Sequence, residues 1–326
     1  MAVTGRRQAK PVPLPAADAR FMPPAIHATP PQAILTRPAH QAEAWLAALG
    51  QFGVRAENLP LIEIQPMQGP AFNEAQQRID EGIDQWDAIM HVSGSAVQHF
   101  WQPARLRRWL ALWQAHPVPD AGSAGSGPAR RVPRLWAPGP GTAQALLALG
   151  LPAGAIDQPR VEAGQFDSEA LWQQVEGQIG EGSRVLIVRG LDGNAADTAN
   201  AADTAATPAL AQPLAGHGRD WLSQALRQRG AEVELLAVYR RICPSWSAHQ
   251  RALASAAAAQ RKVWVFSSSE ALHHLALLLP GHDWAAHRAI ATHARIVQKT
   301  RALGFGTARE SRPTPQDVAL AIKSLP

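Results

Sequence analysis

The chain has 326 residues, of which 46% are hydrophobic and 17% are charged, a composition typical of a folded globular protein. This length suffices for two domains of ordinary size, each with its own core. The formal net charge of +5 suits an anionic partner. Lysine and arginine never form a long basic run, and there is a single tyrosine, so the sequence predicts no nucleic-acid partner.

Cysteine usage and the length of apolar runs exclude further classes. Cys243 is the only cysteine, which excludes an intrachain disulfide and a cysteine-based metal site and indicates a reducing compartment. No apolar run approaches the roughly 20 residues that cross a bilayer. Arg6, Arg7 and Lys10 are not followed by the apolar stretch of a secretory signal. We therefore expect a cytoplasmic protein with no membrane partner and no metal.

Three segments are expected to lie outside the folded core. Residues 1–32 are rich in proline and alanine and predict a disordered extension. Residues 117–133 and 192–217 predict flexible insertions, because neither segment can bury enough apolar surface to order itself.

The remaining sequence alternates short apolar runs with helical patterns. We expect strands at 33–36, 59–64, 88–92, 184–188, 233–239 and 263–266, and helices at 42–49, from 96, and at 221–229. This alternation predicts parallel sheets with helices on both faces. A weak internal repeat of the same motifs supports two similar α/β lobes.

Polar residues recur where the predicted strands end, and ligands of open parallel sheets bind beyond the carboxyl ends of the strands. A small hydroxyl residue before a helix either caps that helix or helps to bind an anion. An arginine directly after a strand either holds a carboxylate through two hydrogen bonds or pairs with a nearby acid. Their recurrence in both lobes favours a shared anion-binding cleft. The residues are Thr36, Arg37, Ser93, Ser95, Thr142, Arg189, Gly190, Ser267, Ser268, Ser269, Thr292 and His293.

The sequence lacks the familiar nucleotide and nucleophile motifs. The glycines at 139 and 141 form neither a P-loop nor a complete GxGxxG, because Gln144 replaces the third glycine. No nucleophile, base and orienting residue are arranged as a triad, so any chemistry is expected to rest on positioning and neutral hydrogen bonds. Tyr239 comes at the end of a predicted strand, where a phenol is either a general acid or a strand aromatic with a hydrated tip.

The order of the motifs resembles that of bacterial uroporphyrinogen-III synthases. The run ILTRP at 34–38 and the run PLIEI at 60–64 are similar to the opening of those proteins. Further similar segments follow in order at 87–100, 138–143, 188–190, 218–219, 229–233, 238–241, 268–272 and 292–296. Together these segments cover roughly 34–326.

The resemblance implies two flavodoxin-like parallel-sheet lobes joined by a two-stranded β ladder. Lobe 1 would be discontinuous, with residues 33–58 and 245–326, and lobe 2 would span 67–233. The ladder would lie near 59–66 and 234–244. The chain would be a monomer.

The resemblance also implies an activity in tetrapyrrole (heme) biosynthesis. Members of that family cyclise hydroxymethylbilane, a linear tetrapyrrole with eight carboxylates, to uroporphyrinogen III. The terminal hydroxyl leaves as water, a spiro intermediate forms, and ring D is inverted without a cofactor. Carried over onto this sequence, Tyr239 would donate a proton to the departing hydroxyl. The substrate would contact Thr36, Arg37, Ser93, Thr142, Arg189, Gly190, Arg219, Ser268 and His293.

Two other functions remain open at this level. A two-lobed binding protein without catalysis would close on an anionic small molecule and use the same strand ends. A flavodoxin-type regulator would bind a nucleotide instead. Turnover of hydroxymethylbilane separates the enzyme from the binding protein, and absence of saturable nucleotide binding would exclude the regulator.

Overall fold

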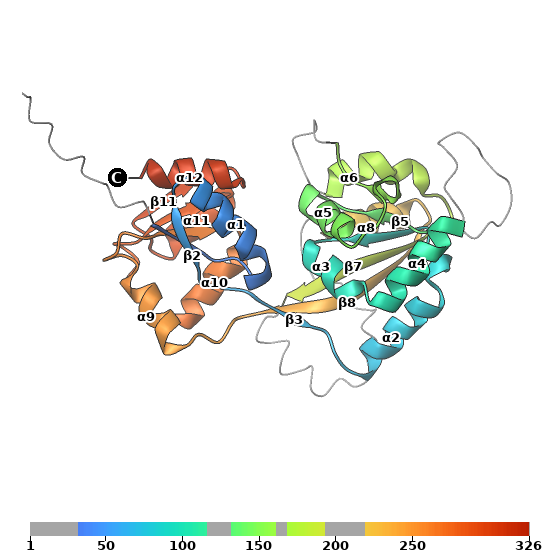
Figure 1. Ribbon diagram of the computed structural model, residues 1–326, viewed down its shortest axis with the longest axis horizontal. Helices are drawn as coiled ribbons and strands as arrows, with labels where there is room; N and C mark the ends of the chain where they lie inside the picture. Colours follow the sequence, from blue (N-terminus) through green and yellow to red (C-terminus); the bar gives the residue numbers. More distant parts are fainter. Residues whose placement is uncertain (1–31, 116–131, 161–167, 193–218, 326) are drawn as a thin grey trace, which may run out of the picture.

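A computed structural model describes residues 32–115, 132–160, 168–192 and 219–325. Almost all of the predicted extension and of both predicted insertions lies outside these ranges, but Gln32, placed in the extension, is the first residue of a strand. The described chain forms two α/β lobes, each built around its own sheet (Figure 1). Two strands join the lobes, which confirms the predicted fold class of two parallel-sheet lobes connected by a β ladder.

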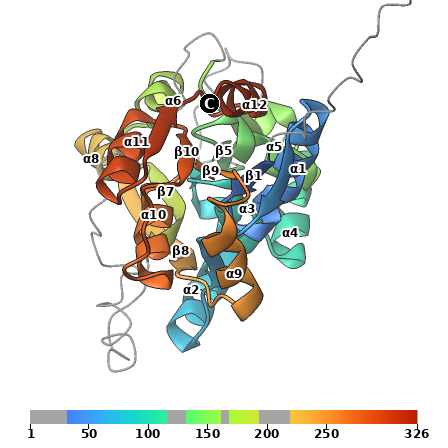
Figure 2. The same ribbon diagram turned by 90° about the vertical axis from the view of Figure 1, so that its left-hand side faces the viewer.

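The first lobe contains a five-stranded sheet in the order β11-β10-β9-β1-β2, with every neighbouring pair parallel. Its strands are β1 (Gln32–Leu35), β2 (Arg55–Asn58), β9 (Val263–Phe266), β10 (Arg288–Ala291) and β11 (Thr307–Glu310). Its helices are α1 (Ala39–Gln51), α9 (Ala248–Ala256), α10 (Ser269–Leu278), α11 (Ala294–Ala302) and α12 (Pro315–Lys323). An end-on view shows these helices around β1, β9 and β10 (Figure 2).

Strand β9 shows why this sheet is covered on both faces. All four of its residues are buried, and successive side chains of a strand point to opposite faces. Val263 and Val265 pack in the cluster that contains residues of α1 and α12, whereas Trp264 and Phe266 pack in the cluster that contains residues of α9, α10 and α11. A continuous apolar run is the pattern expected of a parallel strand between two helical layers.

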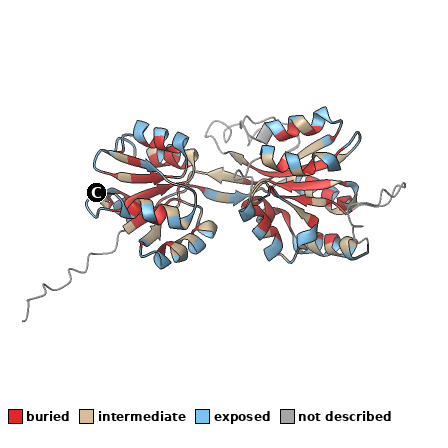
Figure 3. Cartoon of the chain, turned by 90° about the horizontal axis from the view of Figure 1, so that it is seen from above, coloured by how far each residue is buried: buried red, intermediate tan, exposed pale blue. Residues whose placement is uncertain are grey.

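The second lobe contains a six-stranded sheet in the order β3-β8-β7-β4-β5-β6. Its strands are β3 (Glu63–Pro66), β4 (Ala88–His91), β5 (Arg134–Trp136), β6 (Ile156–Asp157), β7 (Arg184–Asp192) and β8 (Glu232–Ile242). Its helices are α2 (Pro70–Glu81), α3 (Gly94–Phe100), α4 (Pro103–Ala115), α5 (Pro140–Ala148), α6 (Ser168–Val175) and α8 (Arg219–Gln228), with short 3-10 turns η1 (Ile83–Gln85), η2 (Ala153–Ala155) and η4 (Glu176–Gln178). Buried residues form a core within each lobe (Figure 3).

The ladder is formed by β3 and β8, which are antiparallel and pair Glu63 with Ile242 and Pro66 with Tyr239. The sequence predicts one extended segment at 59–64. This prediction is wrong, because the chain leaves one sheet at Asn58 and enters the other at Glu63. Pro60 cannot donate a backbone hydrogen bond, and its buried neighbours Leu59 and Leu61 donate to the carbonyl oxygens of Leu35 and Thr36 without forming a regular strand. The lobe boundaries predicted from the resemblance stay a prediction.

The two connections between the lobes are held to the first lobe by hydrogen bonds. The indole Nε1 of Trp246 donates to the carbonyl oxygen of Pro60 at 3.0 Å. The Nδ1 atom of His274 lies 2.6 Å from the carbonyl oxygen of Leu61. Each contact joins residues far apart in the sequence, so the path of the chain between the lobes is fixed by specific partners.

His91, the last residue of β4, is a buried titratable group in the second lobe. It is fully buried, with its ring centroid 5.3 Å from that of Phe100 and 5.8 Å from that of Trp101. Within the described residues, neither ring nitrogen has a hydrogen-bond partner. Burial, together with the nearby charge of Arg105, lowers the pKa of His91 from 6.5 to about 3.

We predict that His91 makes the fold sensitive to acid. Because its pKa is lower in the folded chain, the unfolded chain binds the extra proton and stability falls as the pH drops below 6.5. Between pH 6.5 and 5.0 the wild type should lose about 2 kcal/mol more unfolding free energy than His91→Phe. Urea unfolding at several pH values measures this difference. His249→Gln, at an exposed position, should follow the wild type, and equal slopes for His91→Phe and wild type would refute the effect.

Candidate active site

Strands β7 and β8 run further than the sequence predicts. Arg189 does not follow a strand and Tyr239 does not end one, because β7 continues to Asp192 and β8 to Ile242. The two strands stay paired along this extension. Their pairing therefore continues beyond the apolar residues from which the strand lengths were predicted. The register shifts between Arg189 and Gly190, and the shift places Gly190 opposite Tyr239.

Gly190 provides the space in which the ring of Tyr239 lies. A Cβ atom at this position would come within 2.3 Å of two ring carbons and 2.8 Å of the phenol oxygen. The aromatic ring therefore packs directly on the glycine backbone, and the Tyr239 side chain is only 2% exposed. The close approach explains a requirement for glycine here that the sequence alone does not reveal.

Ser93 holds the other end of the phenol. Its Oγ lies 3.0 Å from the Tyr239 hydroxyl and also accepts a hydrogen bond from the backbone N–H of Ala96 at 3.2 Å, which caps helix α3. A serine hydroxyl has two lone pairs and one proton, so it can serve both partners. The packing with Gly190 and the hydrogen bond with Ser93 fix the phenol at the carboxyl end of the second sheet.

Thr142 lies near the same end of this sheet. It is the third residue of α5, 7% exposed, and follows β5, the parallel neighbour of β4. Helices α3 and α5 are in contact, since a Cβ on Gly94 would lie 3.8 Å from the Cβ of Ala145 and 3.9 Å from the carbonyl oxygen of Gly141. Ser93, Tyr239 and Thr142 thus come from adjacent elements of one lobe.

The predicted arginines of the second lobe are only partly described. Arg189 is 7% exposed, and its Nε donates to the carbonyl oxygen of Gly190 at 3.4 Å. Arg219 is the first residue of α8, and its side chain lies outside the described part. Their contacts with a ligand stay a prediction.

The predicted residues of the first lobe lie at the carboxyl ends of β1, β9 and β10. Ser268 Oγ accepts from the backbone N–H of Glu270 at 3.2 Å and caps α10. His293 is exposed, and its Nδ1 accepts from the backbone N–H of Arg295 at 3.1 Å and caps α11. Both side chains therefore have a structural role, which the sequence already offered as one alternative for Ser268 but not for His293.

Thr36 and Arg37 follow β1 and differ in their surroundings. The Thr36 hydroxyl is 2% exposed and donates to the carbonyl oxygen of Val265 at 2.8 Å, so it links two neighbouring strands. The guanidinium carbon of Arg37 lies 3.9 Å from the ring centroid of Trp45. Burial lowers the pKa of Arg37 from 12.5 to about 10, which leaves the side chain positively charged at neutral pH. Its Nε has no hydrogen-bond partner among the described residues.

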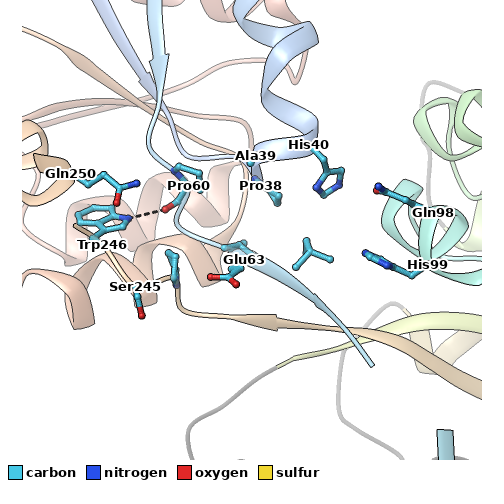
Figure 4. Close-up of a pocket in the computed structure, with 13 residues that line it drawn as sticks. Pro38, Ala39, His40, Pro60, Glu63, Gln98, His99, Ser245, Trp246 and Gln250 are labelled. Atoms are coloured by element: carbon cyan, nitrogen blue, oxygen red, sulfur yellow. Dashed lines mark hydrogen bonds between the residues drawn. The ribbon is translucent and has the colours of Figure 1, made fainter. Parts of the chain in front are cut away.

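A pocket of about 450 Å³ lies between the two lobes (Figure 4). The first lobe and the connections contribute Pro38, Ala39, His40, Pro60, Ile62, Pro244, Ser245, Trp246 and Gln250, and the second lobe contributes Glu63, Ile64, Gln98 and His99. None of the site residues predicted from the sequence lines it. The pocket adjoins the candidate site, since the ring centroids of His99 and Tyr239 are 5.9 Å apart.

His40 reaches across this pocket. Its Nε2 lies 3.1 Å from the Oγ of Ser95, a residue of α3 in the other lobe. Partial burial lowers the pKa of both His40 and His99, and the charge of His99 lowers that of His40 further. Sequence spacing does not reveal these histidines as a pair, although each follows a predicted strand by a few residues at the ligand-binding end of its sheet.

The described part of the chain offers neither a cluster of metal ligands nor a membrane-spanning helix. No three histidine, cysteine, aspartate or glutamate side chains in it are placed to hold a metal ion. None of its helices combines the length and the apolar character needed to cross a bilayer.

A family model described as uroporphyrinogen-III synthase HemD matches residues 43–198 and 196–319. The chain belongs to the uroporphyrinogen-III synthase family. It is also similar to a solved mutant uroporphyrinogen III synthase of Thermus thermophilus, with 14% identity over 90% of this chain and 97% of that chain and a TM-score of 0.43. The uroporphyrinogen-III synthetase of Helicobacter pylori is 10% identical over 90% of this chain and 99% of that chain, with a TM-score of 0.46. The assignment rests on the sequence match.

We predict that Gly190→Ala displaces the Tyr239 ring. The added methyl group cannot be accommodated at 2.3 Å, so the ring must move away from Ser93, at a cost of about 1–3 kcal/mol in stability. The uroporphyrinogen-III synthase activity of the variant should fall more than about tenfold, because a small displacement of a reacting group lowers the reaction rate strongly. Gly177→Ala is the matched control, with no atom within 4 Å of the added methyl group. Thermal unfolding and turnover are measured for both variants. Equal activity in Gly190→Ala and Gly177→Ala would exclude a role of the Gly190 packing in positioning Tyr239.

Proposed function

We propose that this chain cyclises hydroxymethylbilane to uroporphyrinogen III, with loss of water and inversion of ring D. The observation that carries the proposal is the family match, which spans 43–319 in two overlapping segments. The arrangement of Tyr239, Ser93 and Gly190 is compatible with this chemistry, because it presents one fixed phenol beside a cleft between two lobes.

Tyr239 is proposed as the general acid. The phenol donates its proton to the terminal hydroxyl of the substrate, which leaves as water and gives an electrophilic azafulvene. The substituted carbon at the far end of the chain then attacks, and the spiro intermediate fragments and recloses with ring D inverted. The proton released from carbon as the final ring forms restores the phenol, so the net change is the loss of one water.

Ser93 supports this transfer in two ways. Its hydroxyl can donate to the phenolate while the proton is away, which stabilises the negative charge on oxygen. Its second role as the cap of α3 prevents it from rotating freely. Thr142 and Gly190 are proposed as nearby contacts of the substrate within the same lobe.

The carboxylates of the substrate are proposed to bind arginines from both lobes. Among the described residues, no acidic side chain forms an ion pair with Arg37 or Arg189, so both charges are available to a ligand. An arginine can hold a carboxylate through two parallel hydrogen bonds, and Arg37 has an unused Nε for one of them. Arg219 is proposed as a third partner. Thr36, Ser268 and His293 would contribute from the first lobe.

We also propose the lobe boundaries given by the family resemblance, with residues 33–58 and 245–326 in one lobe and 67–233 in the other. The chain is proposed to act as a cytoplasmic monomer that needs no cofactor. The single cysteine supports a reducing compartment.

The identity of the isomer tests the function. Freshly made hydroxymethylbilane, incubated with the protein, should give mainly the type III uroporphyrinogen, whereas the unaided reaction gives type I. The products are oxidised to porphyrins and the isomers separated by chromatography. A product mixture equal to that of the protein-free control would refute the enzyme and favour a binding protein without catalysis.

We predict that Tyr239→Phe lowers kcat by about 100-fold or more, because a positioned general acid contributes a factor of this order. The ring and its packing on Gly190 are retained, so thermal unfolding should change little. Ser93→Ala should have a smaller effect, because it removes the partner of the phenol but not the proton donor. Wild-type kinetics in Tyr239→Phe would exclude the phenol as the acid.

A further inference from the structure

The pocket between the lobes has a polar side formed by two histidines and a glutamine. His40 comes from α1 of the first lobe, and Gln98 and His99 come from α3 of the second (Figure 4). They lie together at one side of the pocket, whereas Glu63 lies at the other side. The group contains none of the site residues assigned above from the family resemblance, although Gln98 and His99 lie within the similar segment 87–100.

Apart from Glu63, Ser245 and Gln250, the remaining wall of the pocket is apolar and suits a flat ring. Ile62, Ile64, Pro60 and Trp246 contribute to it, and the indole is held in place by its hydrogen bond to the carbonyl oxygen of Pro60. A mostly apolar wall with a few convergent polar groups is the usual make-up of a small-molecule site. A volume of about 450 Å³ lies near the lower end of such sites, so the pocket takes part of a large ligand rather than all of it.

We propose that this pocket is a subsite for one pyrrole ring of the linear tetrapyrrole, in which His40 and His99 bind a carboxylate side chain of that ring from opposite lobes. The proposal rests on the proposed function and adds a contact to it. In the present structure the Nε2 of His40 is 3.1 Å from the Oγ of Ser95, and the incoming carboxylate replaces this hydroxyl as the partner of His40.

The charges around the two imidazoles favour an anion once it arrives. Partial burial makes each imidazole less easily protonated than usual, and the charge of His99 lowers the pKa of His40 further. A carboxylate between them attracts the positive charge of the imidazolium form and opposes the effect of burial, so binding takes up protons. Among the titratable groups that face them, Glu63 on β3 lies at the far side of the pocket and Tyr239 on β8 adjoins His99. The segment 244–250 adds no charged residue to the lining.

The test compares His40→Gln and His99→Gln with the wild type. Glutamine keeps a hydrogen-bond donor but cannot take up a proton. The wild-type KM for hydroxymethylbilane should fall as the pH is lowered from 8 to 6, and the substrate carboxylates stay ionised over this range. In each variant KM should rise by about three- to tenfold at pH 6.5, with a smaller change in kcat, and its dependence on pH should flatten.

Two further variants separate substrate binding from a purely structural contact. Ser95→Ala removes the partner of His40 in the other lobe and leaves the contact of its Nε2 with the Gln41 amide at 3.2 Å, so it should leave KM unchanged or lower it. If Ser95→Ala instead raises KM as His40→Gln does, then His40 acts by joining the lobes and the subsite is refuted. His273→Gln, at an exposed position on α10 outside the pocket, is the control for loss of a histidine and should behave as the wild type.

The outcome also distinguishes this proposal from the function on which it rests. If the wild type forms type III uroporphyrinogen while both histidine variants keep the wild-type KM at every pH, the subsite is wrong and the function stands. If the wild type forms only the type I product, the enzyme assignment fails and the pyrrole subsite fails with it.

Discussion

The eleven-residue strand β8 is the element on which the arrangement of the molecule depends. It pairs in parallel with β7 inside the second lobe and in antiparallel with β3 where the chain passes to the first lobe. Tyr239 lies where these two pairings overlap, opposite Gly190 on one side and Pro66 on the other. A residue of a strand that is paired on both edges cannot shift without disturbing the sheet, and this rigidity suits a proton donor.

The hydroxyl and imidazole groups at the strand ends are mostly engaged in holding the fold. Ser93, Ser268 and His293 cap helices, and Thr36 links two strands. Such groups are fixed in direction, and Ser93 shows that one oxygen can cap a helix and contact a phenol at once. A polyanionic ligand would therefore bind mainly to the arginines and to the histidines of the pocket. The N–H groups of these side chains are not all used in hydrogen bonds to the backbone.

The sequence predicts the local features of this fold well, because periodicity and turn residues report local structure. The run VWVF at 263–266 is a buried strand, and the helix expected from 96 is present as α3, which begins two residues earlier at Gly94 and is capped by Ser93. What the sequence cannot report is where pairing between distant strands stops. Arg189 and Tyr239 therefore fall inside longer strands than expected, and the break at 59–62 is hidden within a run that reads as extended.

Contacts between the lobes escape sequence analysis for the same reason. His40 and Ser95 are 55 residues apart and belong to helices of different lobes, and neither carries a motif that points to the other. The closeness of Gly190 to the Tyr239 ring depends on a register shift that no local pattern encodes. The family resemblance does supply Tyr239 and Ser93 as site residues, and the structure brings these two into hydrogen-bonding distance.

The two lobes also touch through polar contacts that differ in how readily a ligand can replace them. The ion pair between Arg241 of β8 and Glu270 of α10, at 2.8 Å, lies beside the ladder and joins a fixed strand to a capped helix. The contact between His40 and Ser95 joins two helix beginnings across a pocket that is open to a ligand. A carboxylate competes poorly with the first, because Arg241 already has a carboxylate partner. It competes well with the second, since an imidazole gains more from an anion than from a neutral hydroxyl. Binding of a polyacid would thus exchange the contact at the pocket while the ladder keeps the lobes in register.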